Sequence, residues 1–118
     1  GRLEVLGSGG YTIYAGFEKA GGIKPGSVVE IAGVEVGRVK SIKLDNYQAL
    51  LELVINEGIK IQSDAIASVK TKGLIGEKYV QITPGGSEKI LAGGGKIRET
   101  ESAIDIEELI SKYVFGKV

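Results

Sequence analysis

The sequence predicts an all-β fold of about seven strands, either a sandwich or a barrel, followed by one short C-terminal α-helix. Three observations lead to this prediction. Glycine is frequent, with 19 residues, and it separates short runs rich in β-branched residues, which is typical of small all-β proteins. Several of these runs alternate apolar and polar residues with the period of two that a half-buried strand requires. Only the final segment has the period of a helix.

The N-terminal half of the chain contains four predicted strands. In the first, every second residue from Tyr11 to Phe17 is apolar or aromatic, so these side chains share one face. Pro25 and Gly26 are the strongest turn signal before the second strand. The four strands are expected at residues 11–17, 27–31, 34–44 and 48–55.

The C-terminal half contains three more predicted strands and the helix. The strands are expected at residues 65–71, 79–83 and 96–100, and the helix at residues 102–116. We therefore expect a β domain over residues 11–101, preceded by a flexible lead-in at residues 1–10. The apolar residues of the helix follow the i, i+3, i+4, i+7, i+8 rule. They are Ile106, Leu109, Ile110, Tyr113 and Val114.

The apolar face of this helix has two interpretations. It packs against the strands of its own chain, or it packs against other copies of the chain or a membrane partner. A short helix that leaves a small barrel has little core to cover, so the sequence leaves both interpretations open.

Composition argues against nucleic-acid binding and catalysis. Lys+Arg and Asp+Glu number 15 each, so the basic excess of a nucleic-acid binder is missing. The chain has no His and no Cys, which removes the commonest general base and the commonest metal ligands, so we expect neither an enzyme nor a metal or cofactor. Asp105, Glu107 and Glu108 fall in the first helical turns, where negative charge suits the helix dipole. The glycine-rich segment 32–39 lacks the phosphate-loop pattern and predicts a strand kink or bulge instead.

The candidate functional motif is the tetrapeptide Gly73-Leu74-Ile75-Gly76. Glycines on both sides permit a sharp chain reversal. Leu74 and Ile75 either fold back into the core as part of a tight turn, or project from the barrel as an apolar tip. An exposed apolar tip is costly in water and therefore indicates a ligand or partner.

The order and spacing of five segments resemble the mammalian-cell-entry (MCE) domain family. Within it, the chain is most similar to the membrane-anchored, ring-forming subunits of the bacterial systems that maintain lipid asymmetry (Mla). The resemblance runs from residue 11 to residue 116, and each segment alone is modest. The segments are residues 11–17, 21–29, 31–39, 71–79 and 100–110.

The resemblance implies a seven-stranded β-barrel that assembles as a homohexameric ring around a central pore. The pore of the family is lined by an apolar pair that falls here on Leu74 and Ile75, where Leu-Leu is more usual. The implied cargo is phospholipid, and the implied partners are the permease and ATPase subunits of an ABC transporter. Family members are periplasmic and anchored to the inner membrane by an N-terminal helix. We therefore expect this chain to be a periplasmic portion without its anchor, with residues 102–116 gathering the subunits. The alternative is an adaptor barrel that binds a protein through Leu74 and Ile75.

Overall fold

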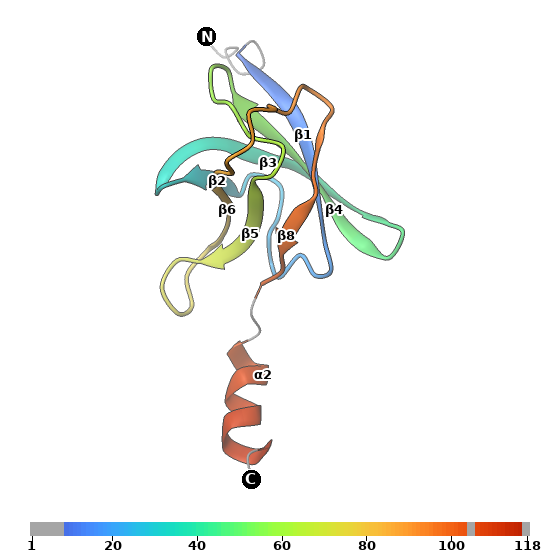
Figure 1. The fold of residues 1–118 in the computed structure, drawn as a ribbon. Coiled ribbons are helices and arrows are strands. Elements are labelled where there is room, and N and C mark those ends of the chain that lie inside the picture. Colours follow the sequence, from blue (N-terminus) through green and yellow to red (C-terminus); the bar gives the residue numbers. More distant parts are fainter. Residues whose placement is uncertain (1–8, 104–105, 117–118) are drawn as a thin grey trace.

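A computed structural model of the chain describes residues 9–103 and 106–116, with side chains at residues 9–103 and 108–114 (Figure 1). Residues 1–8 of the expected lead-in lie outside this description, and Gly10 begins the first strand. The strands are β1 (Gly10–Phe17), β2 (Val28–Ile31), β3 (Val34–Asp45), β4 (Gln48–Asn56), β5 (Ile66–Thr71), β6 (Lys78–Thr83), β7 (Lys96–Ile97) and β8 (Glu99–Glu101). The helical segment is α2 (Ile106–Ser111), which continues as the π-helical turn η1 (Lys112–Gly116).

The strands form one sheet in the order β7-β1-β4-β3-β2-β6-β5-β8. The two edge strands β7 and β8 are separated along the chain by Arg98 alone. β7 pairs in parallel with β1, and β8 pairs in parallel with β5, so one short segment joins both edges of the sheet. The Thr100 hydroxyl adds a link by donating to the Gly16 carbonyl at 2.8 Å. The sheet is therefore nearly closed into a barrel, which confirms the predicted fold class.

The strand count differs from the prediction by one. The expected strand at residues 96–100 is divided at Arg98. This division has a physical reason, because a segment that serves both edges must leave one partner strand before it can pair with the other. A sequence pattern records the extended conformation of such a segment, whereas only the tertiary pairing shows that it changes partner.

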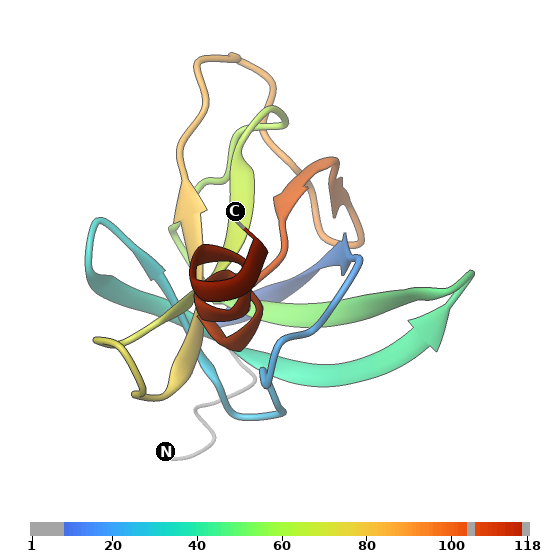
Figure 2. The ribbon, with the colours of Figure 1, turned by 90° about the horizontal axis from the view of Figure 1, so that it is seen from below.

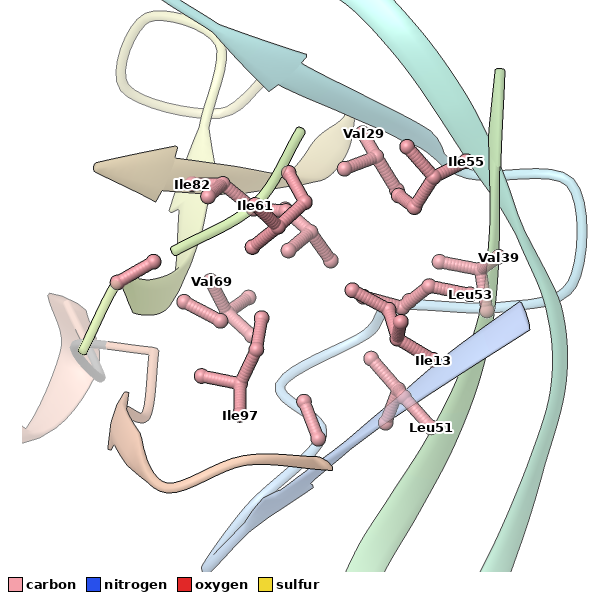
Figure 3. Close-up of a cluster of buried hydrophobic side chains, with 14 of the residues drawn as sticks. Ile13, Val29, Val39, Leu51, Leu53, Ile55, Ile61, Val69, Ile82 and Ile97 are labelled. Atoms are coloured by element: carbon pink, nitrogen blue, oxygen red, sulfur yellow. The ribbon is translucent and has the colours of Figure 1, made fainter. Parts of the chain in front are cut away.

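The core lies inside the barrel and is mainly aliphatic (Figure 3). The alternation that predicted the first strand buries Ile13, Ala15 and Phe17 completely. β1 pairs antiparallel with β4, which places Ile13 opposite Leu53 and lines both strands along the same interior. The fully buried side chains of β4 are Leu51, Leu53 and Ile55. Burial of such side chains, at roughly 25 cal/mol per Å² of apolar surface, is the main force that holds the barrel together.

The glycine-rich segment that could be mistaken for a phosphate loop is strand and turn. Ala32 and Gly33 both have positive φ and form the tight turn between β2 and β3. The pairing of these two strands shifts register between Val29 and Glu30, as a β-bulge does. The expected kink or bulge in this region is therefore present.

The helical segment leaves the barrel at one end (Figure 1) and lies in front of the middle of the barrel when viewed from that end (Figure 2). The side chains of Leu109, Ile110, Tyr113 and Val114 are between 49% and 85% exposed. The apolar face is therefore not buried against the strands of its own chain. This excludes the interpretation in which the helix packs on its own barrel. The side chain of Ile106, the fifth residue of the predicted face, lies outside the described residues.

Candidate functional site

The loop of Gly73, Leu74, Ile75 and Gly76 joins β5 to β6. The last ladder pair of these strands is Thr71 with Lys78, and beyond it the Lys72 N–H donates to the Glu77 carbonyl at 2.9 Å. The four residues thus form the tip of a closed hairpin. Figure 1 shows this tip at the end of the barrel from which α2 leaves.

Both apolar side chains of the tip point into solvent. Leu74 is 79% exposed and Ile75 is 95% exposed. They do not fold back into the core, so the interpretation of the motif as a core-filling turn is wrong. Two adjacent branched side chains held in water have no stabilising role in this chain alone, which makes the tip a candidate contact for an apolar ligand or partner.

The glycines that flank the pair permit the shape of the loop. Gly73 has a φ of +68°, a backbone conformation that other residues rarely adopt. Gly76 lies against the main chain of Lys72, where an added Cβ would stand 2.0 Å from the Lys72 carbonyl oxygen. The first glycine therefore permits the turn, and the second allows the two arms of the loop to approach each other.

An ion pair between a buried carboxylate and a half-exposed ammonium lies at the base of the loop. Glu30 of β2 is 8% exposed, and its Oε2 lies 2.7 Å from the Lys72 Nζ. The same Nζ lies 4.3 Å from the centre of the Tyr79 ring, within range of a cation–π interaction. The hydrogen bond and charge of Glu30 raise the pKa of Lys72 above its usual value, against the opposing effect of desolvation. Lys72 is therefore a fixed cation one residue before the glycine that starts the loop.

Sequence reasoning did not identify Glu30 or Lys72 as functional residues. The available signal was a charged residue inside the apolar run of β2, which is uncommon unless the charge has a partner. The partner lies 42 positions along the chain, and no local pattern points to it.

The helical face is the second candidate surface. Its exposed apolar side chains are Leu109 and Ile110 of α2 and Tyr113 and Val114 of η1. α2 lies at the same end of the barrel as the loop tip (Figure 1). The structure thus brings both apolar features that the sequence identified to one end of the barrel.

Within the described residues, no group of three or more His, Cys, Asp or Glu side chains is placed to hold a metal ion. Asp64, whose pKa is lowered, accepts backbone hydrogen bonds from Ser87 and Gly86 and so fastens the loop after β6. Of the other acidic candidates, Asp105 and the Glu107 side chain lie outside the description, and the Glu108 side chain is exposed. The described helices are all too short to cross a bilayer.

The comparisons with known proteins agree on one family. A family model described as MlaD protein matches residues 9–85. A Haemophilus influenzae protein named intermembrane phospholipid transport system binding protein MlaD is 37% identical over 112 residues, which cover 90% of this chain and 67% of that protein. The Escherichia coli K12 protein of the same name is 38% identical over 114 residues, which cover 90% of this chain and 62% of that protein. The chain thus spans about two thirds of the length of these relatives.

The fold agrees with a solved structure as well. A chain of the Acinetobacter MlaFEDB complex in its ATP-bound Vtrans1 conformation superposes with a TM-score of 0.81 and 28% identity, over 88% of this chain and 81% of that chain. The resemblance to the MCE domains of the Mla systems is therefore confirmed, and the chain belongs to the MlaD family.

Proposed function

We propose that this chain is the periplasmic MCE domain of a phospholipid-transport protein, and that it acts by contacting lipid rather than by catalysis. The observation that carries the proposal is the apolar tip of Leu74 and Ile75, held in solvent between two glycines. The names of the Haemophilus and Escherichia relatives, which are phospholipid transport system binding proteins, support the choice of ligand.

The tip contacts acyl chains in this proposal. A phospholipid that crosses an aqueous compartment must keep its tails from water, and each shielded methylene is worth about 0.8 kcal/mol. Six copies of the pair, arranged as a homohexameric ring, form a narrow apolar collar. Apolar contact is non-directional, so such a collar holds a tail without trapping it in one pose. The same collar opposes the free passage of ions and water.

The helix gathers the subunits around the collar. Its exposed apolar face needs a partner, and a neighbouring copy of the same helix supplies a matching face. The helix and the loop leave the barrel at the same end (Figure 1). An assembly through the helices would therefore bring the loop tips toward a common axis.

The energy for transport comes from partner subunits. The structural neighbour is part of a complex captured in an ATP-bound conformation, which supports an ABC ATPase and a permease as partners. We propose that the whole protein is anchored to the bacterial inner membrane and that the barrel lies in the periplasm.

An adaptor barrel is the alternative function. In that case Leu74 and Ile75 bind a protein and never touch lipid. Mass spectrometry of the purified protein separates the two functions, because co-purified phospholipid is expected of a lipid carrier and not of an adaptor.

Replacement of both tip residues tests the proposal directly. The double variant Leu74→Asn/Ile75→Asn is expected to abolish phospholipid transfer between donor and acceptor vesicles in the intact protein with its partners, while the barrel stays folded. The matched control is Leu44→Asn/Tyr47→Asn, which changes two similarly exposed apolar side chains of the β3–β4 hairpin and is expected to transfer normally. Normal transfer by the Leu74/Ile75 variant would end the pore-loop assignment.

A further inference from the structure

We propose that Glu30 is a positioning residue, whose carboxylate holds Lys72 and thereby fixes the direction in which the loop presents Leu74 and Ile75. This inference rests on the proposed role of that loop in contacting lipid. It assigns a function to a residue of β2, which lies outside the loop.

Burial makes the Glu30 carboxylate an anchor. A carboxylate that is nearly removed from water is stable only when it is paired and hydrogen-bonded. In the part of the chain that the structure describes, the salt-bridge partner of Glu30 is Lys72, whose Nζ lies 2.7 Å from the Glu30 Oε2. β2 itself is held in the sheet by β3 on one side and by β6 on the other, so the position of the carboxylate is set by the barrel.

Lys72 transmits this position to the loop. Its ammonium lies between the Glu30 carboxylate and the Tyr79 ring, its N–H closes the hairpin onto Glu77, and its carbonyl packs against Gly76. Side chain and main chain of one residue are thus fixed at once. A shift of Lys72 therefore moves both arms of the loop.

The loop needs such a contact because its own backbone does not set its direction. The β5–β6 ladder ends at Thr71 and Lys78, and the glycines beyond it allow many conformations. The tip side chains are exposed and so gain no orientation from packing within the chain. The ion pair lies where the ladder stops, which is the point from which a small rotation displaces the tip most.

A spin label reports the orientation of the tip independently of lipid. This chain contains no cysteine, so a cysteine introduced at position 75 is its one labelling site. In the intact protein, Glu30→Gln is expected to increase the mobility of the label in the electron paramagnetic resonance spectrum. Without the label, the same variant is expected to cross-link several-fold less at residues 73–76 to a phosphatidylglycerol that carries a diazirine in one acyl chain.

Two further variants and a control separate positioning from stability. Lys72→Met removes the ammonium at a half-exposed position and is expected to mobilise the label even if Glu30→Gln fails to fold. Lys72→Arg keeps the charge and the ring contact. Its label mobility and its lipid cross-linking are therefore expected to match those of the unaltered protein. Lys40→Gln breaks the more remote Lys40–Glu52 pair between β3 and β4, at 3.8 Å, and is expected to change neither.

The outcomes are distinct. An unchanged label spectrum in Glu30→Gln and Lys72→Met would overturn the inference, whatever happens to the unfolding temperature. A mobile label with unchanged cross-linking would overturn it as well, because the orientation would then not matter for lipid contact. If Leu74→Asn/Ile75→Asn transfers lipid normally, the proposed function fails, whereas the label spectrum still reports whether Glu30 positions the loop.

Discussion

Gly76 approaches Lys72 so closely that no side chain fits between them, since a Cβ at position 76 would stand 2.0 Å from the Lys72 carbonyl oxygen. We predict that Gly76→Ala forces the two arms of the loop apart. Displacing a main-chain contact of this kind costs about 1–3 kcal/mol, as overpacking does elsewhere. Urea unfolding measures the loss of stability, and cross-linking to a photoreactive phospholipid measures the accompanying loss of lipid contact.

The control for this variant is Gly86→Ala, where an added Cβ meets nothing within 4 Å. It is expected to leave both measurements within error. Gly73→Ala is the intermediate case, because its Cβ is also free of contacts but its positive φ costs about 1–2 kcal/mol for a residue with a side chain. If Gly76→Ala behaved like Gly86→Ala, the close packing of the loop would not hold in solution.

Leu53 and Leu74 allow the same substitution to be compared in two environments. Leu53 is fully buried and Leu74 is mostly exposed. Leu53→Ala removes packed atoms and leaves a cavity, so we predict a loss of about 2–5 kcal/mol in the free energy of unfolding. Leu74→Ala removes no packing within the chain and is expected to stay within about 0.5 kcal/mol.

Chemical denaturation of the two variants under identical conditions provides the measurement. A loss of stability in Leu74→Ala close to that of Leu53→Ala would mean that the tip packs against its own barrel in solution. The interpretation of the tip as a contact for lipid would then lose its main support.

The sequence predicted the barrel strands well because the alternation of apolar and polar residues along each strand indicates which side chains are buried. Ile13, Ala15 and Phe17 are apolar at every second position, and the structure buries all three. The division of the last strand at Arg98 was not predictable in this way. It depends on two partners, β1 and β5, that lie far away along the chain.

The candidate site was predictable in part. The glycines mark a turn that contains Leu74 and Ile75, but the same pattern suits a turn that packs inward, and only the fold decides between these arrangements. The partner of the apolar helical face could not be predicted from the sequence for the same reason. The pairing of Glu30 with Lys72 joins residues on different strands, and periodicity within a strand carries no information about such a contact.

The attachment of the loop after β6 depends on pH through the ionisation of Asp64. Its Oδ1 accepts from the Ser87 N–H and its Oδ2 from the Gly86 N–H, both at 3.1 Å, and these bonds lower its pKa below the ordinary value of 3.8. A lowered pKa means that the contribution to stability is present above pH 3.8 and is lost as the pH falls through the folded pKa. We predict that the loop around Gly86 detaches only below pH 3.8.

An NMR titration of the Gly86 and Ser87 amide resonances measures this transition. Its midpoint is expected below 3.8. In Asp64→Asn, which keeps an oxygen acceptor and cannot ionise in this range, the acid transition of both resonances is expected to disappear. A midpoint above 3.8 in the unaltered protein would show that the backbone hydrogen bonds do not stabilise the charged carboxylate.

The exposed helical face leads to a prediction about assembly. Removal of residues 106–118 from the intact protein is expected to reduce the oligomer to smaller species, because the apolar side chains of Ile110 and Tyr113 are then no longer available to neighbouring copies. The unfolding temperature of the barrel is expected to change little, since the described helical side chains do not cover its core. Light scattering coupled to size-exclusion chromatography measures the mass.

Point variants refine this test without shortening the chain. Ile110→Ser/Tyr113→Ser removes apolar surface from the helix and is expected to weaken the oligomer, so that its mass falls on dilution. Lys112→Ser changes an exposed polar residue between these two and serves as the control, with an expected mass equal to that of the unaltered protein. Burial of apolar surface drives association in this proposal, so high salt, which screens charges, is expected to leave the oligomer intact. An oligomer that survives both the deletion and the double substitution would assign assembly to the barrel instead of the helix.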